Sequence, residues 1–117
     1  MLHAQGRFDA AEESYLKALE SSPNFVEALA GLSATLQAQG RLHESIQRLE
    51  QVVLLQPDQA PAHSQLAAAL HAHGRLNDAI KSYKTALLLK PDFIEALVSL
   101  GNVFQDLGAL PNAIDSY

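Results

Sequence analysis

The sequence predicts an all-α protein, a right-handed α-solenoid of antiparallel helix pairs, and three observations support this prediction. The first is a repeat of 34 residues, marked by aligned glycines and prolines: Gly6, Gly40, Gly74 and Gly108, and Pro23, Pro57 and Pro91. The second is the recurrence of apolar residues every three or four positions between these markers, as in an amphipathic helix. The third is the short connection at each glycine, which forces neighbouring helices to run antiparallel.

The repeat period divides the chain into consecutive segments of a single domain, residues 1–117. We expect a partial repeat at 1–25, full repeats at 26–59 and 60–93, and a second partial repeat at 94–117. One pair of helices cannot bury its own apolar face, so neighbouring pairs must stack on one another.

The first partial repeat is expected to hold the end of one helix and the whole of the next. Residues 1–5 match the last turn before a turn glycine, so Gly6 should end that helix with a positive φ. Asp9 and Glu12 have the spacing of a capping box for the second helix. That helix should end before Pro23, because the residue preceding a proline avoids the α region.

The two full repeats carry leucines at helical spacing on the first helix of each pair, and Asn24 is expected to cap the first of these helices. The leucines define the buried direction: Leu29, Leu32 and Leu36 in one repeat, and Leu66 and Leu70 in the next. His63 aligns with Leu29 and is expected to pack between helices. One column holds tyrosines beside a leucine, which indicates core and not an aromatic binding ladder: Tyr15, Leu49, Tyr83 and Tyr117.

The last partial repeat continues the apolar stripe of its first helix at Leu97, Leu100 and Phe104. Pro111 is placed to start a further helix at its preferred first position. Ile114 and Tyr117 take core positions of that helix, and no following helix covers them. We therefore expect association through exposed terminal helices, which would give a homo-oligomer.

The composition excludes several functional classes. The chain has no cysteine, and therefore no disulfide framework, thiolate nucleophile or zinc finger. Its net charge of -5 repels phosphate backbones, so neither a nucleic-acid partner in general nor an RNA-binding helical repeat is expected. The N-terminus lacks a signal-peptide pattern, and no stretch reaches the roughly 18 apolar residues of a membrane span. We expect a cytoplasmic protein without a membrane partner.

No group of residues has the arrangement of a catalytic or metal site. The glycines stand 34 residues apart or singly, and not in a phosphate-binding loop. His3 and His71 share a column but are separated by two repeats, which is too far for one metal ion. No sequence feature gives Ser, His or Asp the surroundings of a nucleophile. We expect no enzymatic activity, no catalytic residue, no cofactor and no metal.

Within each repeat, large apolar residues and small or turn residues follow one another in a fixed order: Leu29, Leu32, Leu36, Gly40, Ser45, Leu49, Val52 and Pro57, then His63, Leu66, Ala67, Leu70, Gly74, Ala79, Tyr83, Ala86 and Pro91. This order resembles the tetratricopeptide repeat (TPR), and the resemblance covers the whole chain. It is similar to bacterial TPR proteins and to the arrays that precede O-linked N-acetylglucosamine transferases. The resemblance implies a TPR superhelix that binds other proteins.

Two branches of that family use residues that this chain lacks. The transferase arrays usually carry an asparagine ladder that grips peptide backbone, and the corresponding places here hold Gly31, Gln65 and Ser99. The chaperone-tail clamps bring lysine and arginine onto a terminal carboxylate, and the inner positions here hold neither. A clamp of that type is therefore not expected.

In proteins of this resemblance, the first helix of each pair lines a concave groove. A strip turned about 100° from the buried leucines would form its floor, and the candidate peptide-binding residues are small or neutral: Ala30, Ala34, Gln37, Ser64, Gln65, Ala68, His71, Val98, Asn102 and Gln105. Small side chains leave room for a partner's backbone, to which the amides can hydrogen-bond. We expect a protein-interaction scaffold that binds a neutral or mildly basic peptide or partner segment. The alternative is a recruiting or dimerising segment of a larger enzyme such as a glycosyltransferase.

Overall fold

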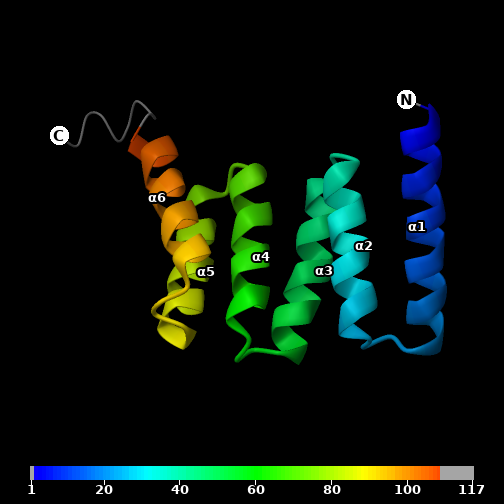
Figure 1. Ribbon diagram of the computed structural model, residues 1–117, viewed down its shortest axis with the longest axis horizontal. Coiled ribbons are helices and arrows are strands. Elements are labelled where there is room, and N and C mark those ends of the chain that lie inside the picture. Colours follow the sequence, from blue (N-terminus) through cyan, green and yellow to red (C-terminus); the bar gives the residue numbers. More distant parts are fainter. Residues whose placement is uncertain (1, 109–117) are drawn as a thin grey trace. The chain divides into compact units, whose positions relative to one another are not determined.

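The computed structural model describes residues 2–108 of the chain, with side chains from residue 7 onward. This range contains six helices and no strands (Figure 1): α1 Leu2–Ser21, α2 Val26–Ala38, α3 Leu42–Leu55, α4 Ala60–Ala72, α5 Leu76–Leu89 and α6 Ile94–Gly108. They belong to two compact units, Met1–Pro57 with α1 to α3 and Asp58–Tyr117 with α4 to α6. The prediction of an all-α fold built from helix pairs is confirmed.

We call α2, α4 and α6 the first helices, because each follows a proline boundary, and α1, α3 and α5 the second helices. In the first unit, α2 packs against both α1 and α3, and in the second unit α5 packs against both α4 and α6. The paired helices run antiparallel, α2 with α3 and α4 with α5 (Figure 1). The second unit therefore contains two first helices, α4 and α6, and these contact each other.

The turn between paired helices has the same geometry in both units. Gly40 has a φ of 79° and Gly74 a φ of 82°, a left-handed conformation that glycine adopts without a Cβ clash. In the first unit, the backbone N–H of Arg41 donates to Leu36 O at 2.8 Å, and that of Gly40 donates to Gln37 O at 3.0 Å. The second unit repeats both bonds. This pair of bonds is the Schellman motif, so the predicted role of these two glycines is confirmed.

The core of each unit lies between its paired helices. The stripe leucines of α2 and α4 are buried, together with these residues of the second helices: Ile46, Leu49 and Val52 of α3, and Ala79, Ile80, Tyr83 and Ala86 of α5. Of the predicted tyrosine column, Tyr83 is buried and Tyr15 is half-buried, whereas Tyr117 lies outside the described residues. His63, expected to pack between helices, is half-buried on α4.

The predicted turn at Gly6 is wrong. α1 is continuous from Leu2 to Ser21, so Gly6 does not end a helix and Asp9 does not cap one. Gly40 and Gly74 turn the chain where a second helix packs back on the first helix before it. No such first helix precedes α1 within the described range. Without that packing, a glycine in a helix interior costs only about 1 kcal/mol relative to alanine, and its neighbours keep the segment helical.

The predicted cap at Asn24 is also wrong. The N-cap of α2 is Phe25, whose side chain makes no capping hydrogen bond. The backbone N–H of Phe25 closes a tight turn around Pro23 by donating to Ser22 O at 3.0 Å. Proline favours the second position of such a turn, which places Asn24 third and the start of the helix one residue later. The same turn precedes α6.

The apolar stripe of α6 is buried less than predicted. Leu97 is 49% exposed and Phe104 is 47% exposed, whereas Ala96 and Val103 are the buried residues of this helix. In α2 and α4, the corresponding stripe belongs to a helix pair whose second member lies within the described residues. The helix expected from Pro111 lies outside the described residues.

Candidate functional site

In the first unit, the predicted peptide-binding strip occupies one helix. Ala30, Ala34 and Gln37 stand at i, i+4 and i+7 along α2, so they share one face of it. Ala34 is exposed, and the other two residues are half-buried. This face offers two small side chains and one amide.

In the second unit, the strip extends over the two neighbouring first helices. α4 contributes Gln65, Ala68 and His71, and α6 contributes three exposed residues: Val98, Asn102 and Gln105. Gln65 and Ala68 are exposed, and His71 is half-buried. Ser64, predicted in the strip, is only 7% exposed and is removed from the candidate set because its side chain is not accessible. We call the remaining residues of α4 and α6 the α4–α6 strip.

A hydrogen bond joins the two helices of the α4–α6 strip. His71 Nε2 lies 2.5 Å from Asp106 Oδ2, and these side chains are 24% and 60% exposed. The nitrogen carries the hydrogen, because an ionised carboxylate can only accept. The sequence pattern does not predict this contact, since Asp106 lies 35 residues from His71. A repeat alignment compares residues 34 apart and so does not reveal such diagonal neighbours.

Charge is unequally distributed between the first and second helices. Within residues 2–108, the first helices carry three acidic residues, Glu27, Glu95 and Asp106, and no lysine or arginine. All eight lysines and arginines of the chain lie on second helices or in turns: Arg7, Lys17, Arg41, Arg48, Arg75, Lys81, Lys84 and Lys90. The first helices, which carry the predicted strips, therefore have no fixed cation to receive a carboxylate.

Two places that correspond to the transferase asparagine ladder are occupied by tyrosines from the preceding second helix. A Cβ added at Gly31 would lie 2.4 Å from the Cζ atom of Tyr15, so the ring covers this glycine. At the corresponding place in the second unit, Ser99 hydrogen-bonds the hydroxyl of Tyr83. Burial raises the pKa of the Tyr83 phenol, and the bond with Ser99 partly opposes this. Gly31 cannot be replaced by a ladder asparagine without moving Tyr15, and at Ser99 the side chain is already hydrogen-bonded to Tyr83.

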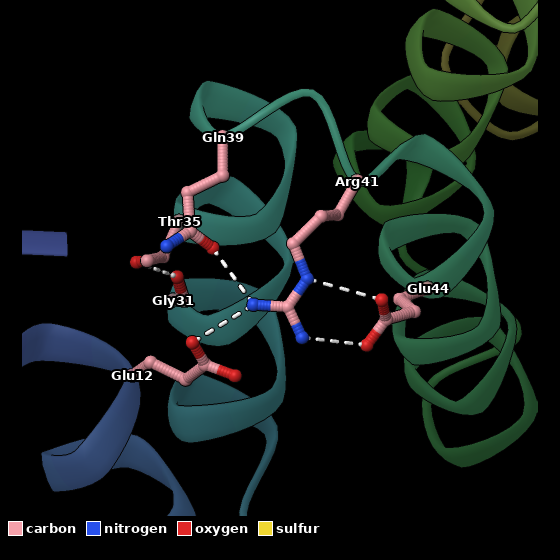
Figure 2. Close-up of polar contacts among 6 residues, drawn as sticks. All are labelled: Glu12, Gly31, Thr35, Gln39, Arg41 and Glu44. Atoms are coloured by element: carbon pink, nitrogen blue, oxygen red, sulfur yellow. Dashed lines mark hydrogen bonds and ion pairs between the residues drawn. The ribbon is translucent and has the colours of Figure 1, made fainter. Parts of the chain in front are cut away.

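Arg41 connects three parts of the first unit (Figure 2). Its Nε and Nη2 atoms donate to the two carboxylate oxygens of Glu44, at 3.0 and 2.8 Å, in a bidentate pair. Its Nη1 atom donates to Glu12 of α1 at 2.9 Å and to Gln39 at 3.1 Å. The bonds to Glu44 and Glu12 raise the pKa of Arg41, and the bond from Arg41 lowers the pKa of Glu44. The cluster fixes α1 to the turn between α2 and α3, which is a structural role.

The described residues provide no group of three or more His, Asp or Glu side chains that could hold a metal ion. Among the described helices, none is long and apolar enough to cross a membrane. Neither the α4–α6 strip nor the Arg41 cluster contains a hydroxyl that is hydrogen-bonded to a histidine, the arrangement that activates a nucleophile.

Comparison with known proteins identifies the repeat. A tetratricopeptide repeat family profile matches residues 2–70, and a TPR repeat profile matches residues 68–108. No curated protein gives a match.

Solved structures with the same fold include the crystal structure of MamA, which is 30% identical over 98% of this chain and 67% of that one, with a TM-score of 0.81. The first TPR of Spaghetti (RPAP3), bound to an HSP90 peptide, is 25% identical over 90% of this chain and 83% of that one, with a TM-score of 0.81. A Thermobaculum terrenum O-GlcNAc transferase mutant is 29% identical over 86% of this chain but only 19% of that one, with a TM-score of 0.75. Because a family profile covers more than half of the residues and the Schellman turns and leucine stripes repeat with its period, the chain belongs to the tetratricopeptide repeat family.

Proposed function

We propose that the chain is a protein-interaction scaffold that binds a peptide segment of a partner protein on its first helices. The observation that carries the proposal is the α4–α6 strip, where exposed amide and small side chains from two neighbouring first helices lie within one compact unit. The Spaghetti TPR domain, whose fold is the same, has been solved bound to an HSP90 peptide. That complex supports peptide binding as the use of this fold.

The chemistry of the strip suits an extended backbone. Each of Gln65, Asn102 and Gln105 offers a carbonyl acceptor and an NH₂ donor, so each can pair with either side of a peptide group. Ala68 is exposed on the same helix as Gln65 and projects only a methyl group, which leaves space for the ligand. Main-chain recognition of this kind binds peptides with limited dependence on their side chains.

Peptide binding by alanine variants tests the proposal. We expect Asn102→Ala and Gln105→Ala each to weaken binding of a peptide selected from a random library, because each removes two hydrogen-bonding groups. Asn77→Ala, which removes an exposed amide from α5, is the matched control and should bind like the wild type. Equal affinities for all of these chains would remove the strip from the proposal.

The alternative function is a recruiting or dimerising segment of a larger enzyme. The resemblance to the O-GlcNAc transferase favours it, since this chain corresponds to a fifth of that protein. The tyrosines at Gly31 and Ser99 argue against substrate binding through an asparagine ladder. Association through exposed terminal helices would fit a dimerising role. Light scattering across a concentration series tests this association, and a constant monomer mass would contradict it.

A further inference from the structure

We infer that the His71–Asp106 pair anchors a cationic side chain of the bound peptide, so that the α4–α6 strip selects basic segments over acidic ones. The inference rests on the proposed function and specifies the chemistry of the partner. It follows from the geometry of the pair together with the distribution of charge over the helices.

The geometry leaves Asp106 able to accept a further donor. His71 Nε2 donates to Oδ2, and this contact fixes the carboxylate at the junction of α4 and α6. An ionised carboxylate has about four acceptor positions, of which one N–H occupies one. The Asp106 side chain is 60% exposed, so a lysine or arginine from a ligand can reach it.

The pair lies beside the residues proposed to hold the peptide backbone. Asp106 stands one helical turn after Asn102 on α6, and His71 stands one helical turn after Ala68 on α4. A backbone held by Asn102 and passing over Ala68 would therefore bring one of its side chains close to the Asp106 carboxylate.

The charge of the first helices points the same way. Glu95 and Asp106 are the acidic residues on the first helices of this unit, and those helices carry no lysine or arginine. An acidic peptide would meet like charge and no partner for its carboxylates, whereas a basic peptide would meet opposite charge. The HSP90 peptide in the Spaghetti complex, SRMEEVD, has three acidic side chains, so its charge is opposite to that of the basic segments inferred for this chain.

An exposed ion pair changes affinity only modestly, by up to about fivefold. A bias of this size is best measured over many ligands at once. The full chain would therefore be immobilised and used to select from a phage-displayed library of random peptides at low salt. The frequency of Lys and Arg among the selected peptides is then compared with the unselected library.

Asp106→Asn is the test variant, because it keeps the shape of the side chain and removes its charge. Asp78→Asn is the matched control, since Asp78 is a similarly exposed aspartate on α5 that pairs with Arg75 outside the strip. Circular dichroism would establish that both variants are folded. We expect the wild type and Asp78→Asn to enrich Lys and Arg and to deplete Asp and Glu, and Asp106→Asn to lose most of this bias.

Affinities of one selected peptide give the second measurement. Replacing its enriched basic residue by glutamine should weaken binding to the wild type about threefold to fivefold at low salt, with a smaller ratio at high salt. The same replacement should leave binding to Asp106→Asn unchanged.

Different results overturn different parts of the argument. Selected peptides without a charge bias, or the same bias with Asp106→Asn, would overturn the inference and leave peptide binding in place. Failure of the wild type to enrich any peptide would overturn the proposed function as well.

Discussion

The hydroxyl of Ser45 on α3 donates to the backbone carbonyl of Ser33 on α2 at 3.0 Å, and the two hydroxyl oxygens lie 2.8 Å apart. Because the Ser45 hydrogen is used on the carbonyl, Ser33 Oγ must be the donor between the hydroxyls. Both side chains are fully buried. In the second unit, the same positions are held by Ala67 and Ala79, which are also fully buried and cannot form such bonds.

This comparison predicts strong coupling between the two serines. Ser45→Ala leaves the buried Ser33 hydroxyl without that partner, and we expect the free energy of unfolding to fall by about 1–3 kcal/mol. The double variant Ser33→Ala/Ser45→Ala reproduces the pair found in the second unit, so it should be more stable than Ser45→Ala. Urea unfolding of the wild type, both single variants and the double variant gives the coupling energy. Additive effects would contradict the prediction.

Gly31 and Gly101 lie on α2 and α6 and should respond oppositely to alanine. At Gly31 the new methyl group would overlap the ring of Tyr15, and such overpacking costs roughly 1–3 kcal/mol. A Cβ added at Gly101 would meet no atom within 4 Å apart from its chain neighbours and the backbone of its own helix, so alanine should stabilise α6 by about 0.5–1 kcal/mol through its higher helix propensity.

Thermal unfolding of the two glycine variants measures this difference. Tyr15→Leu, which places at this position the residue found at Leu49, should relieve the overlap and rescue Gly31→Ala. If Gly31→Ala raised the melting temperature as Gly101→Ala is expected to do, the result would contradict the close packing of Tyr15 on α2.

Acid should weaken the first unit through the pair of Arg41 and Glu44. The bond from Arg41 lowers the pKa of Glu44 below its ordinary value of 4.5. A carboxyl with a lowered pKa in the folded state contributes stability above its unfolded pKa, and this is lost as the pH falls through the folded pKa. We therefore expect the free energy of unfolding to fall more steeply below pH 4.5 in the wild type than in Glu44→Gln.

Urea unfolding at a series of acid pH values checks this expectation. Glu50→Gln removes an exposed carboxyl from the same helix and should keep the steepness of the wild type. If the free energy of unfolding fell with pH equally steeply in the wild type and in Glu44→Gln, the pair of Arg41 and Glu44 would not contribute to acid sensitivity.

Raising the pH should destabilise the second unit through ionisation of the Tyr83 phenol. Burial raises the pKa of its phenol above the ordinary value of 10.0, so the neutral form is favoured in the folded protein. The resulting stability is present below pH 10.0 and is lost as the pH rises through the folded pKa. At high pH, the free energy of unfolding of Tyr83→Phe should therefore fall less steeply with rising pH than that of the wild type.

Ultraviolet titration of the phenols adds a second readout for Tyr83. Ser99 lowers the pKa of this phenol by its hydrogen bond, so Ser99→Ala should move the ionisation to still higher pH. A shift to lower pH would mean that the bond favours the neutral phenol.

The turns and the paired cores could be predicted from sequence because they depend on residues close together in the chain. A glycine at the end of a leucine stripe predicts the Schellman turn at Gly40, and the stripe itself predicts the burial of Leu29 and Leu32. Gly6 carries the same local signal and forms no turn, since the required packing of one helix on another is a tertiary contact.

The candidate site could be predicted only in part, and for a similar reason. Helical spacing placed Ala68 and Asn102 on exposed faces, but the burial of Ser64 depends on surrounding helices that spacing does not describe. The His71–Asp106 pair depends on how far α6 is displaced along α4, which sets the atoms that meet across two helices.

The serine and alanine pairs also restrict how the gene for this protein can evolve. Repeats with the same period can recombine with one another, and a crossover between the codons for Ser33 and Ser45 would join a serine from one repeat to an alanine from the other. The hybrid repeat would keep every leucine and glycine of the pattern and still bury a hydroxyl that has lost its partner. Crossovers outside that interval would keep each pair of residues together. The junctions of viable hybrids should therefore lie outside the interval between the codons for Ser33 and Ser45.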